Sequence, residues 1–171
     1  GHMQKRGLGK RSIARTLSAI RTFYRYLANA NDIDANPAKM VGTPKAERYL
    51  PSYLDKAQIE LLFQLAEARA LEGAFVDVRN LAILELFYSS GLRLAELVSL
   101  DVASVDVYSE NVRVLGKGRK ERVVPVGAPA LNAIQKYRQE ANVHAGPLFL
   151  SKVRRRLAPE NVWLVLKRYL P

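Results

Sequence analysis

Cysteine is absent from this 171-residue chain, which excludes disulfides and zinc–thiolate sites. Histidine occurs twice, and His2 belongs to residues 1–3, Gly-His-Met, which we interpret as a scar of tag removal. Because only His144 remains, a site with two histidine ligands is excluded, and we expect no metal and no cofactor. No apolar run approaches the roughly 20 residues that a membrane span needs, and no signal peptide is visible. We therefore expect a cytoplasmic protein without a membrane partner.

Positive charge is abundant and unevenly placed. The net charge is +11 and the isoelectric point is near 10.1. Residues 1–45 carry a net charge of +7, residues 46–112 carry −6, and residues 113–171 carry +10. Two basic blocks that flank an acidic body favour a polyanionic partner held from two sides. A basic surface that is merely solvated is the alternative interpretation.

Residues 4–40 predict one long amphipathic helix and no complete core. Over residues 12–29, apolar side chains recur at spacings of four and three, as on a helix with one buried face. They are Ile13, Leu17, Ile20, Tyr24 and Leu27. A single helix cannot build a core, so this segment is interpreted as the C-terminal part of a small helical domain. Residues 41–54, rich in glycine and proline and without a period, predict an interdomain linker. A membrane-surface helix is a competing interpretation that polar residues on the apolar side disfavour.

Residues 55–171 predict the main domain, of a mainly α class with a small three-stranded antiparallel sheet (α+β). Asp55 and Gln58 form a capping-box pattern at the start of a helix. Asp77 is the expected cap of the next helix, over residues 78–90. The side chains of that helix are apolar nearly all round, so it should form the buried centre.

Three short β-rich runs separated by turn residues follow, at 104–107, 111–115 and 122–126, and they predict the antiparallel strands. A helix is predicted over 128–140, and Pro159 opens the final helix.

Two stretches suit an anionic ligand. Residues 88–100 read as a helix end, a glycine turn and a new helix that opens with Arg93, where a helix start offers free backbone N–H groups. Residues 115–122, Leu-Gly-Lys-Gly-Arg-Lys-Glu-Arg, read as a tight turn that carries Lys117 to the tip of a hairpin. By residue type alone, the favoured interpretations are a surface ion pair of Arg93 with Glu96 and a solvated turn residue at Lys117.

Their combination resembles a known family. Ser-Gly-Leu-Arg-Leu-Ala-Glu-Leu-Val-Ser-Leu at 90–100 and Val-Leu-Gly-Lys-Gly-Arg-Lys-Glu-Arg-Val-Val-Pro-Val-Gly at 114–127 resemble the tyrosine recombinases, specifically the XerC/XerD group. The linker Pro-Lys-Ala-Glu-Arg-Tyr-Leu-Pro at 44–51 also matches, so the resemblance covers nearly the whole chain. It implies a helical DNA core-binding domain, of which residues 4–40 are the end, and a catalytic domain that begins at residue 55.

The resemblance also implies a chemistry and its residues. The family is a group of site-specific recombinases that break and rejoin duplex DNA through a 3′-phosphotyrosyl intermediate, without a metal ion. Arg93 matches the first catalytic arginine, Glu96 the acidic residue that supports it, and Lys117 the lysine of the β-hairpin. A guanidinium offers paired donors to the charge that develops on a phosphate, and a hairpin lysine can protonate the leaving oxygen.

The match is incomplete at its C-terminal side. The family continues with a His-x-Leu-Arg-His motif, a further histidine or tryptophan, and the nucleophilic tyrosine, and no residues here match them. Tyr24, Tyr88 and Tyr169 lie in helical patterns, so none is assigned as the nucleophile. We therefore expect a fragment truncated at both ends, inactive in cleavage, and monomeric, whereas the parent should be a tetramer on DNA.

Seven basic residues are the expected DNA contacts: Lys10, Arg11, Arg15, Arg119, Lys120, Arg154 and Arg155. Two other functions remain open. One is a noncatalytic DNA-binding protein on the same scaffold, and the other is a basic protein that binds RNA or assembles with proteins. Recombination in chromosome segregation and recombination in DNA integration are both compatible with the resemblance.

Overall fold

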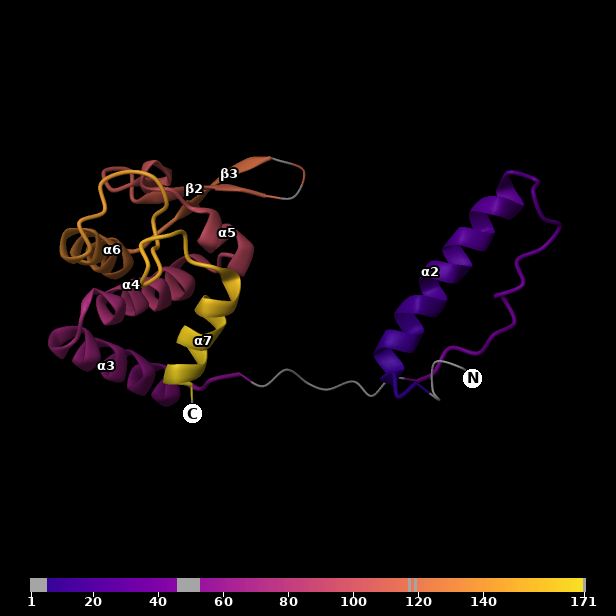
Figure 1. Cartoon of the computed structure of the whole chain (residues 1–171), viewed down its shortest axis with the longest axis horizontal. Coiled ribbons are helices and arrows are strands. Elements are labelled where there is room, and N and C mark those ends of the chain that lie inside the picture. The colour runs from indigo at the N-terminus through magenta and orange to yellow at the C-terminus, as the bar shows by residue number, and fades with distance from the viewer. Residues whose placement is uncertain (1–5, 46–52, 117, 119, 171) are drawn as a thin grey trace. The chain divides into compact units, whose positions relative to one another are not determined.

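The structure is a computed structural model that describes residues 6–45, 53–116, 118 and 120–170. It divides into two compact units, Gly1–Tyr53 and Leu54–Pro171 (Figure 1). The predicted linker, residues 41–54, overlaps the boundary, and its residues 46–52 lie outside the described part.

The first unit is built on helix α2, Lys10–Asn29, as the apolar spacing predicted. Arg21 ties the following segment to this helix. Its guanidinium donates hydrogen bonds to the carbonyl oxygen of Ala38 at 3.1 Å, to Thr43 Oγ1 at 2.9 Å and to the carbonyl oxygen of Val41. Leu17 is the one buried residue of α2, so the apolar stripe has little to pack against within its own unit.

The second unit is organised around helix α4. Its helices are α3 (Lys56–Glu72), α4 (Phe75–Ser90), α5 (Leu94–Ser99), α6 (Ala128–Glu140) and α7 (Pro159–Tyr169), with a 3₁₀ turn, η1, at Val102–Ser104. Figure 1 shows α4 between α3 and α6, and it contacts both, as well as α7 and strand β3. Ala82, Ile83 and Leu86 of α4 are fully buried, which confirms the expected central helix.

The sheet has three antiparallel strands in the order β1-β2-β3, as predicted. They are β1 (Val105–Asp106), β2 (Asn111–Leu115) and β3 (Glu121–Pro125). In β2 the buried Val112 and Val114 alternate with exposed neighbours, so one face of the sheet packs on the core. The first strand is shorter than the predicted 104–107 at both ends. Ser104 belongs to η1, where its backbone N–H donates to the carbonyl oxygen of Asp101 at 2.9 Å, and Val107 lies in the turn that follows.

The capping predictions had different outcomes. Asp55 caps α3 through a reciprocal capping box, because Gln58 N donates to Asp55 Oδ1 at 2.8 Å and Asp55 N donates to Gln58 Oε1 at 2.9 Å. The prediction that Asp77 caps α4 was wrong. The N-cap is Ala74, and Asp77 lies in the first helical turn, where a carboxylate still suits the helix dipole. The helix starts early because Phe75 packs against the core.

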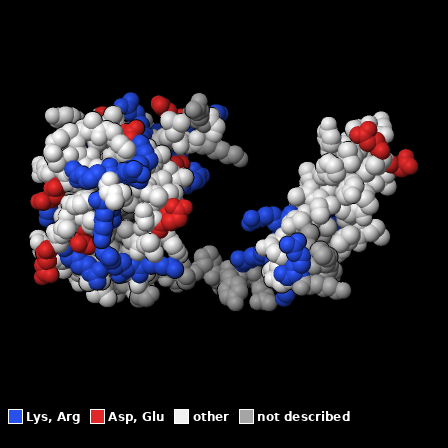
Figure 2. All heavy atoms as spheres, viewed as in Figure 1, with Lys and Arg blue, Asp and Glu red and all other residues white. Residues whose placement is uncertain are grey.

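Basic side chains are spread over the surfaces of both units (Figure 2). No helix within the described residues is long and apolar enough to cross a membrane. The same residues contain no group of three or more histidine, cysteine, aspartate or glutamate side chains that could hold a metal ion.

Candidate functional site

A left-handed glycine ends α4 and sets the position of Arg93. Gly91 has φ of +57°, a conformation that other residues adopt at a cost, and its N–H donates to the carbonyl oxygen of Phe87 at 2.9 Å. Leu92 is buried and anchors the turn in the core. The chain then reverses, and Arg93, in extended backbone geometry, becomes the N-cap of α5.

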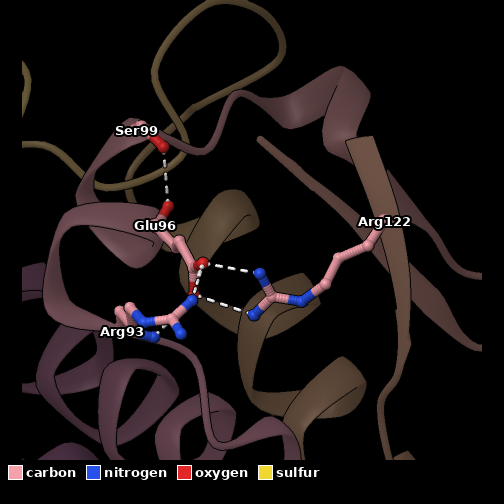
Figure 3. Close-up of polar contacts among 4 residues, drawn as sticks. All are labelled: Arg93, Glu96, Ser99 and Arg122. Carbon is pink, nitrogen blue, oxygen red and sulfur yellow. Dashed lines mark hydrogen bonds and ion pairs between the residues drawn. The ribbon is translucent and has the colours of Figure 1, made fainter. Parts of the chain in front are cut away.

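The carboxylate of Glu96 lies between two guanidinium groups (Figure 3). On one side, Glu96 Oε2 accepts from Arg93 N at 2.8 Å and Oε1 accepts from Arg93 Nη1 at 2.9 Å. On the other side, Arg122 of β3 donates from Nη1 to Oε1 at 2.6 Å and from Nη2 to Oε2 at 3.0 Å. The backbone carbonyl of Glu96 accepts from Ser99 Oγ at 2.8 Å. One carboxylate therefore fixes both arginines.

The electrostatics leave Arg93 available to an anion. Glu96 is only 5% exposed, and its hydrogen bonds from Arg122 and then from the backbone N–H of Arg93 lower its pKa to about 2. The same contact raises the pKa of Arg122. The group of two arginines and one carboxylate carries a net charge of +1. Because the Arg93 side chain is 74% exposed, this positive charge is fixed in position and open to solvent.

Arg122 is the site residue that sequence reasoning missed. In the register of the sheet, Arg122 pairs with Val114 and Val124 pairs with Val112, so Arg122 occupies the face that packs on the core. The sequence contained a signal, since Arg122, Val124 and Val126 recur at a spacing of two residues, which places them on one face of a strand. A charged side chain on the core face of a strand needs a partner of opposite charge, and Glu96 is that partner.

Arg156 binds the C-terminal end of α5. Arg156 Nη1 donates to the carbonyl oxygens of Val98 at 3.0 Å and Leu100 at 3.1 Å, and Nη2 donates to Asp101 Oδ1 at 2.6 Å. These carbonyls lie at the C-terminal end of the helix, where intrahelical partners run out. The six-residue helix that follows Arg93 is thus held from β3 and from the loop before α7.

Of the predicted site residues, the structure brings Arg93 and Glu96 together. Lys117 and Arg119 lie outside the described residues. Lys120 is exposed beside β3, and its carbonyl accepts from Gly116 N at 2.8 Å. The remaining expected DNA contacts lie on α2 or in the loop before α7: Lys10, Arg11 and Arg15 on the helix, and Arg154 and Arg155 in the loop. Arg154 lies over the ring of Phe75 at 5.7 Å.

Residues 52–170 match the phage integrase family, which is more than half of the chain. This chain belongs to the phage integrase family. The resemblance to tyrosine recombinases is confirmed by relatives in this family. Tyrosine recombinase XerC of Haemophilus ducreyi is 40% identical over 168 residues, which cover 96% of this chain and 54% of the relative. XerC of Actinobacillus succinogenes is 43% identical over 162 residues, covering 93% of this chain and 53% of the relative. This integrase-family chain spans about half the length of the curated relatives that it matches.

Solved structures share the fold. The crystal structure of XerA recombinase matches with a TM-score of 0.60 and 22% identity, over 96% of this chain and 55% of that one. The Tn1549 transposon integrase in complex with circular intermediate DNA matches with a TM-score of 0.70 and 16% identity, over 98% of this chain and 61% of that one. These likenesses, with the observed helices and sheet, confirm the expected mainly α fold with a small antiparallel sheet.

Proposed function

We propose that this chain is a DNA-binding part of a site-specific tyrosine recombinase, in which Arg93 holds the phosphate at the position of strand cleavage. The observation that carries the proposal is the exposed Arg93 guanidinium, fixed by a buried carboxylate. The two basic blocks and the relatives named tyrosine recombinase support it. An integrase solved in complex with DNA is a neighbour in fold.

The proposed reaction needs positive charge rather than a metal ion. A tyrosine hydroxyl loses its proton and attacks phosphorus, the bond to the 5′ oxygen breaks, and a 3′-phosphotyrosyl bond forms. Arg93 would neutralise charge on the nonbridging oxygens, while Lys117 would give a proton to the departing 5′ oxygen. We assign the attacking hydroxyl to none of the eight tyrosines of this sequence. The chain by itself would therefore bind DNA without cutting it.

Glu96 and Arg122 have supporting roles in this proposal. A carboxylate beside Arg93 could cancel the charge that a phosphate needs, but Glu96 also binds Arg122, so the group keeps a net positive charge. Glu96 then orients Arg93 and sets its distance from the sheet. Further proposed phosphate contacts are Lys10, Arg11, Arg15, Arg119, Lys120, Arg154 and Arg155. The chain alone is proposed to be monomeric, because the family's tetramer contacts belong to a segment C-terminal to the matched motifs.

A salt titration of duplex binding tests the proposal. If the chain neutralises roughly 5–6 phosphates, log K against log salt should slope near −5 between about 50 and 200 mM salt. Arg93→Ala should weaken binding and make the slope less steep by about one. Lys56→Gln, which also removes one positive charge but from the exposed face of α3, is the matched control and should leave the slope unchanged. A binding constant that does not change with salt would contradict binding through phosphate contacts. Preference for structured RNA over duplex DNA in a competition experiment would favour the RNA-binding alternative.

A further inference from the structure

A second group of basic residues lines a cavity at the start of α4, away from the Arg93–Glu96 contact. A cavity of about 330 Å³ lies between the start of α4, the loop after Leu150, and α7. Its polar lining consists of Arg79, Asn80, Ser151, Lys152, Asn161 and Arg168. Arg79 and Ser90 are eleven residues apart on α4, which corresponds to roughly 16 Å along the helix. The cavity is therefore separate from the turn that presents Arg93.

Arg79 is a buried cation whose hydrogen-bond acceptors are neutral. Its residue is 5% exposed. Nη1 donates to the carbonyl oxygen of Leu150 at 2.7 Å, and Nε and Nη2 donate to Asn80 Oδ1 at 3.3 and 2.8 Å. Burial lowers the pKa of this guanidinium. Among the described residues Arg79 has no ion pair within salt-bridge distance, and a buried charge without a partner of opposite sign is costly.

The charges around the cavity are unbalanced. Arg168 pairs with Asp77 at 3.5 Å, and Asp77 also acts on Arg79 from the first turn of α4. Lys152 is exposed at the cavity wall. These three cations and one carboxylate carry a net charge of +2. Figure 2 shows a band of basic side chains on this face of the second unit, over the loop before α7 and toward α7 and α3.

We propose that this cavity binds a phosphate group, supplied either by a free pyrophosphate-like compound or by a nucleic-acid backbone. A phosphate would supply a negatively charged partner for Arg79. Three of the five guanidinium N–H groups donate to Asn80 and Leu150, so two remain to donate to a ligand. Ser151 Oγ already accepts from Arg155 N at 3.3 Å, so its hydroxyl hydrogen is free to donate to a ligand. The volume lies at the lower end of the range for small-ligand pockets, which is about 300–1,000 Å³.

Calorimetric titration with sodium pyrophosphate, at constant ionic strength, tests the cavity as a built site. Wild-type chain should bind saturably, and Arg168→Gln or Lys152→Gln should each weaken binding by about tenfold, the usual effect of losing one charge-assisted contact. Lys167→Gln is the matched control. It removes the same charge from the neighbouring position of α7, but Lys167 lies over Trp163 and does not line the cavity. This variant should change the affinity by less than about twofold.

Thermal unfolding keeps the test independent of folding defects. Pyrophosphate should raise the Tm of the wild-type chain and of Lys167→Gln, and should leave the Tm of the double variant Lys152→Gln, Arg168→Gln unchanged. Absence of saturable pyrophosphate binding would overturn the proposal. So would equal weakening by Lys167→Gln and Arg168→Gln, because general surface charge would then explain the binding.

Short duplex DNA distinguishes the two sources of phosphate. If duplex displaces pyrophosphate and the double variant also weakens duplex binding, the ligand is a backbone phosphate. If pyrophosphate binds and the duplex does not displace it, the ligand is a free phosphate compound. This proposal does not rest on the role of Arg93. Arg93→Ala should weaken duplex binding at the first site and leave the pyrophosphate affinity unchanged.

Discussion

At the residue scale, the site depends on Glu96. Its carboxylate is nearly inaccessible to solvent, yet it stays ionised because Arg122 and the backbone of Arg93 donate to it. A buried charge of this kind is tolerated only when its hydrogen bonds are satisfied. The arginines on either side are more exposed, with Arg122 at 41%, so they can regain water if the carboxylate is removed.

Glu96→Gln should destabilise the chain in a pH-dependent way. The pKa of Glu96 in the folded chain, about 2, lies below its ordinary value of 4.5. Its contribution to stability is therefore fully present above pH 4.5 and is lost as the pH falls toward 2. We expect a loss of about 1.5–3 kcal/mol at pH 7, the usual value of hydrogen bonds to a charged group. Urea unfolding from pH 7 to pH 3 should show the difference between wild type and variant shrinking below pH 4.5. A constant difference would contradict the role of the ionised carboxylate.

Arg93 and Lys117 should respond differently to a change of leaving group. The test uses this sequence joined to the C-terminal part of one of its XerC relatives, which under the proposed function would supply the nucleophile. Arg93→Ala should abolish cleavage, and Arg93→Lys should restore little because paired donors are lost. Lys117→Ala should cost about 10²–10⁴-fold, the usual contribution of a positioned acid. A substrate with sulfur in place of the bridging 5′ oxygen should rescue Lys117→Ala alone, since sulfur leaves without a proton. Equal rescue of both variants, or of neither, would reject Lys117 as the acid.

At the scale of elements, α5 is too short to be stable by itself. Six residues form fewer than two turns, so the helix that carries Glu96 relies on tertiary contacts. Arg122 joins it to β3 at its start, and Arg156 joins it to the loop before α7 at its end. The position of Arg93 thus depends on side chains that lie 29 and 63 residues later in the chain.

Arg122→Gln should loosen the contact between α5 and β3. Glu96 would keep its hydrogen bonds to Arg93 but lose both hydrogen bonds from Arg122, so the variant should be less stable than wild type. Urea unfolding measures this loss of stability. Arg113→Gln on the adjacent strand is the control, because Arg113 makes one exposed hydrogen bond, to the carbonyl oxygen of Ala103, and its loss should cost less than about 0.5 kcal/mol. Similar losses in the two variants would argue against a specific role for Arg122.

At the scale of the whole molecule, the placement of Tyr169 argues against this residue as the nucleophile. Tyr169, at the end of α7, is 4% exposed and packs with Leu62, Ala66 and Leu84. Its ring lies under the guanidinium of Arg69. Tyr169 is also ten residues beyond Pro159, or roughly 15 Å along the helix from the end near Leu94. A buried hydroxyl at the far end of α7 is poorly placed to attack a phosphate at Arg93.

The chain alone should therefore form no covalent adduct with DNA. A suicide substrate incubated with wild-type chain should give no protein–DNA band on a denaturing gel, because the resemblance to the family matches none of the eight tyrosines to the nucleophile. Tyr169→Phe should behave identically. A covalent band that disappears in Tyr169→Phe would show that α7 moves enough to expose this residue and would overturn the prediction.

The sequence by itself determined the features that depend on neighbours along the chain. The stripe of α2, the capping box at Asp55, the proline start of α7 and the glycine turn before Arg93 are local, so spacing and residue type were sufficient. Only the tertiary structure decided that Arg122 forms an ion pair with Glu96 and that Arg79 lines a cavity. Both features depend on segments distant in the sequence, which sheet register and helix packing bring together. The start of α4 at Phe75, ahead of Asp77, is also a tertiary feature, since Phe75 is partly buried and packs against the core.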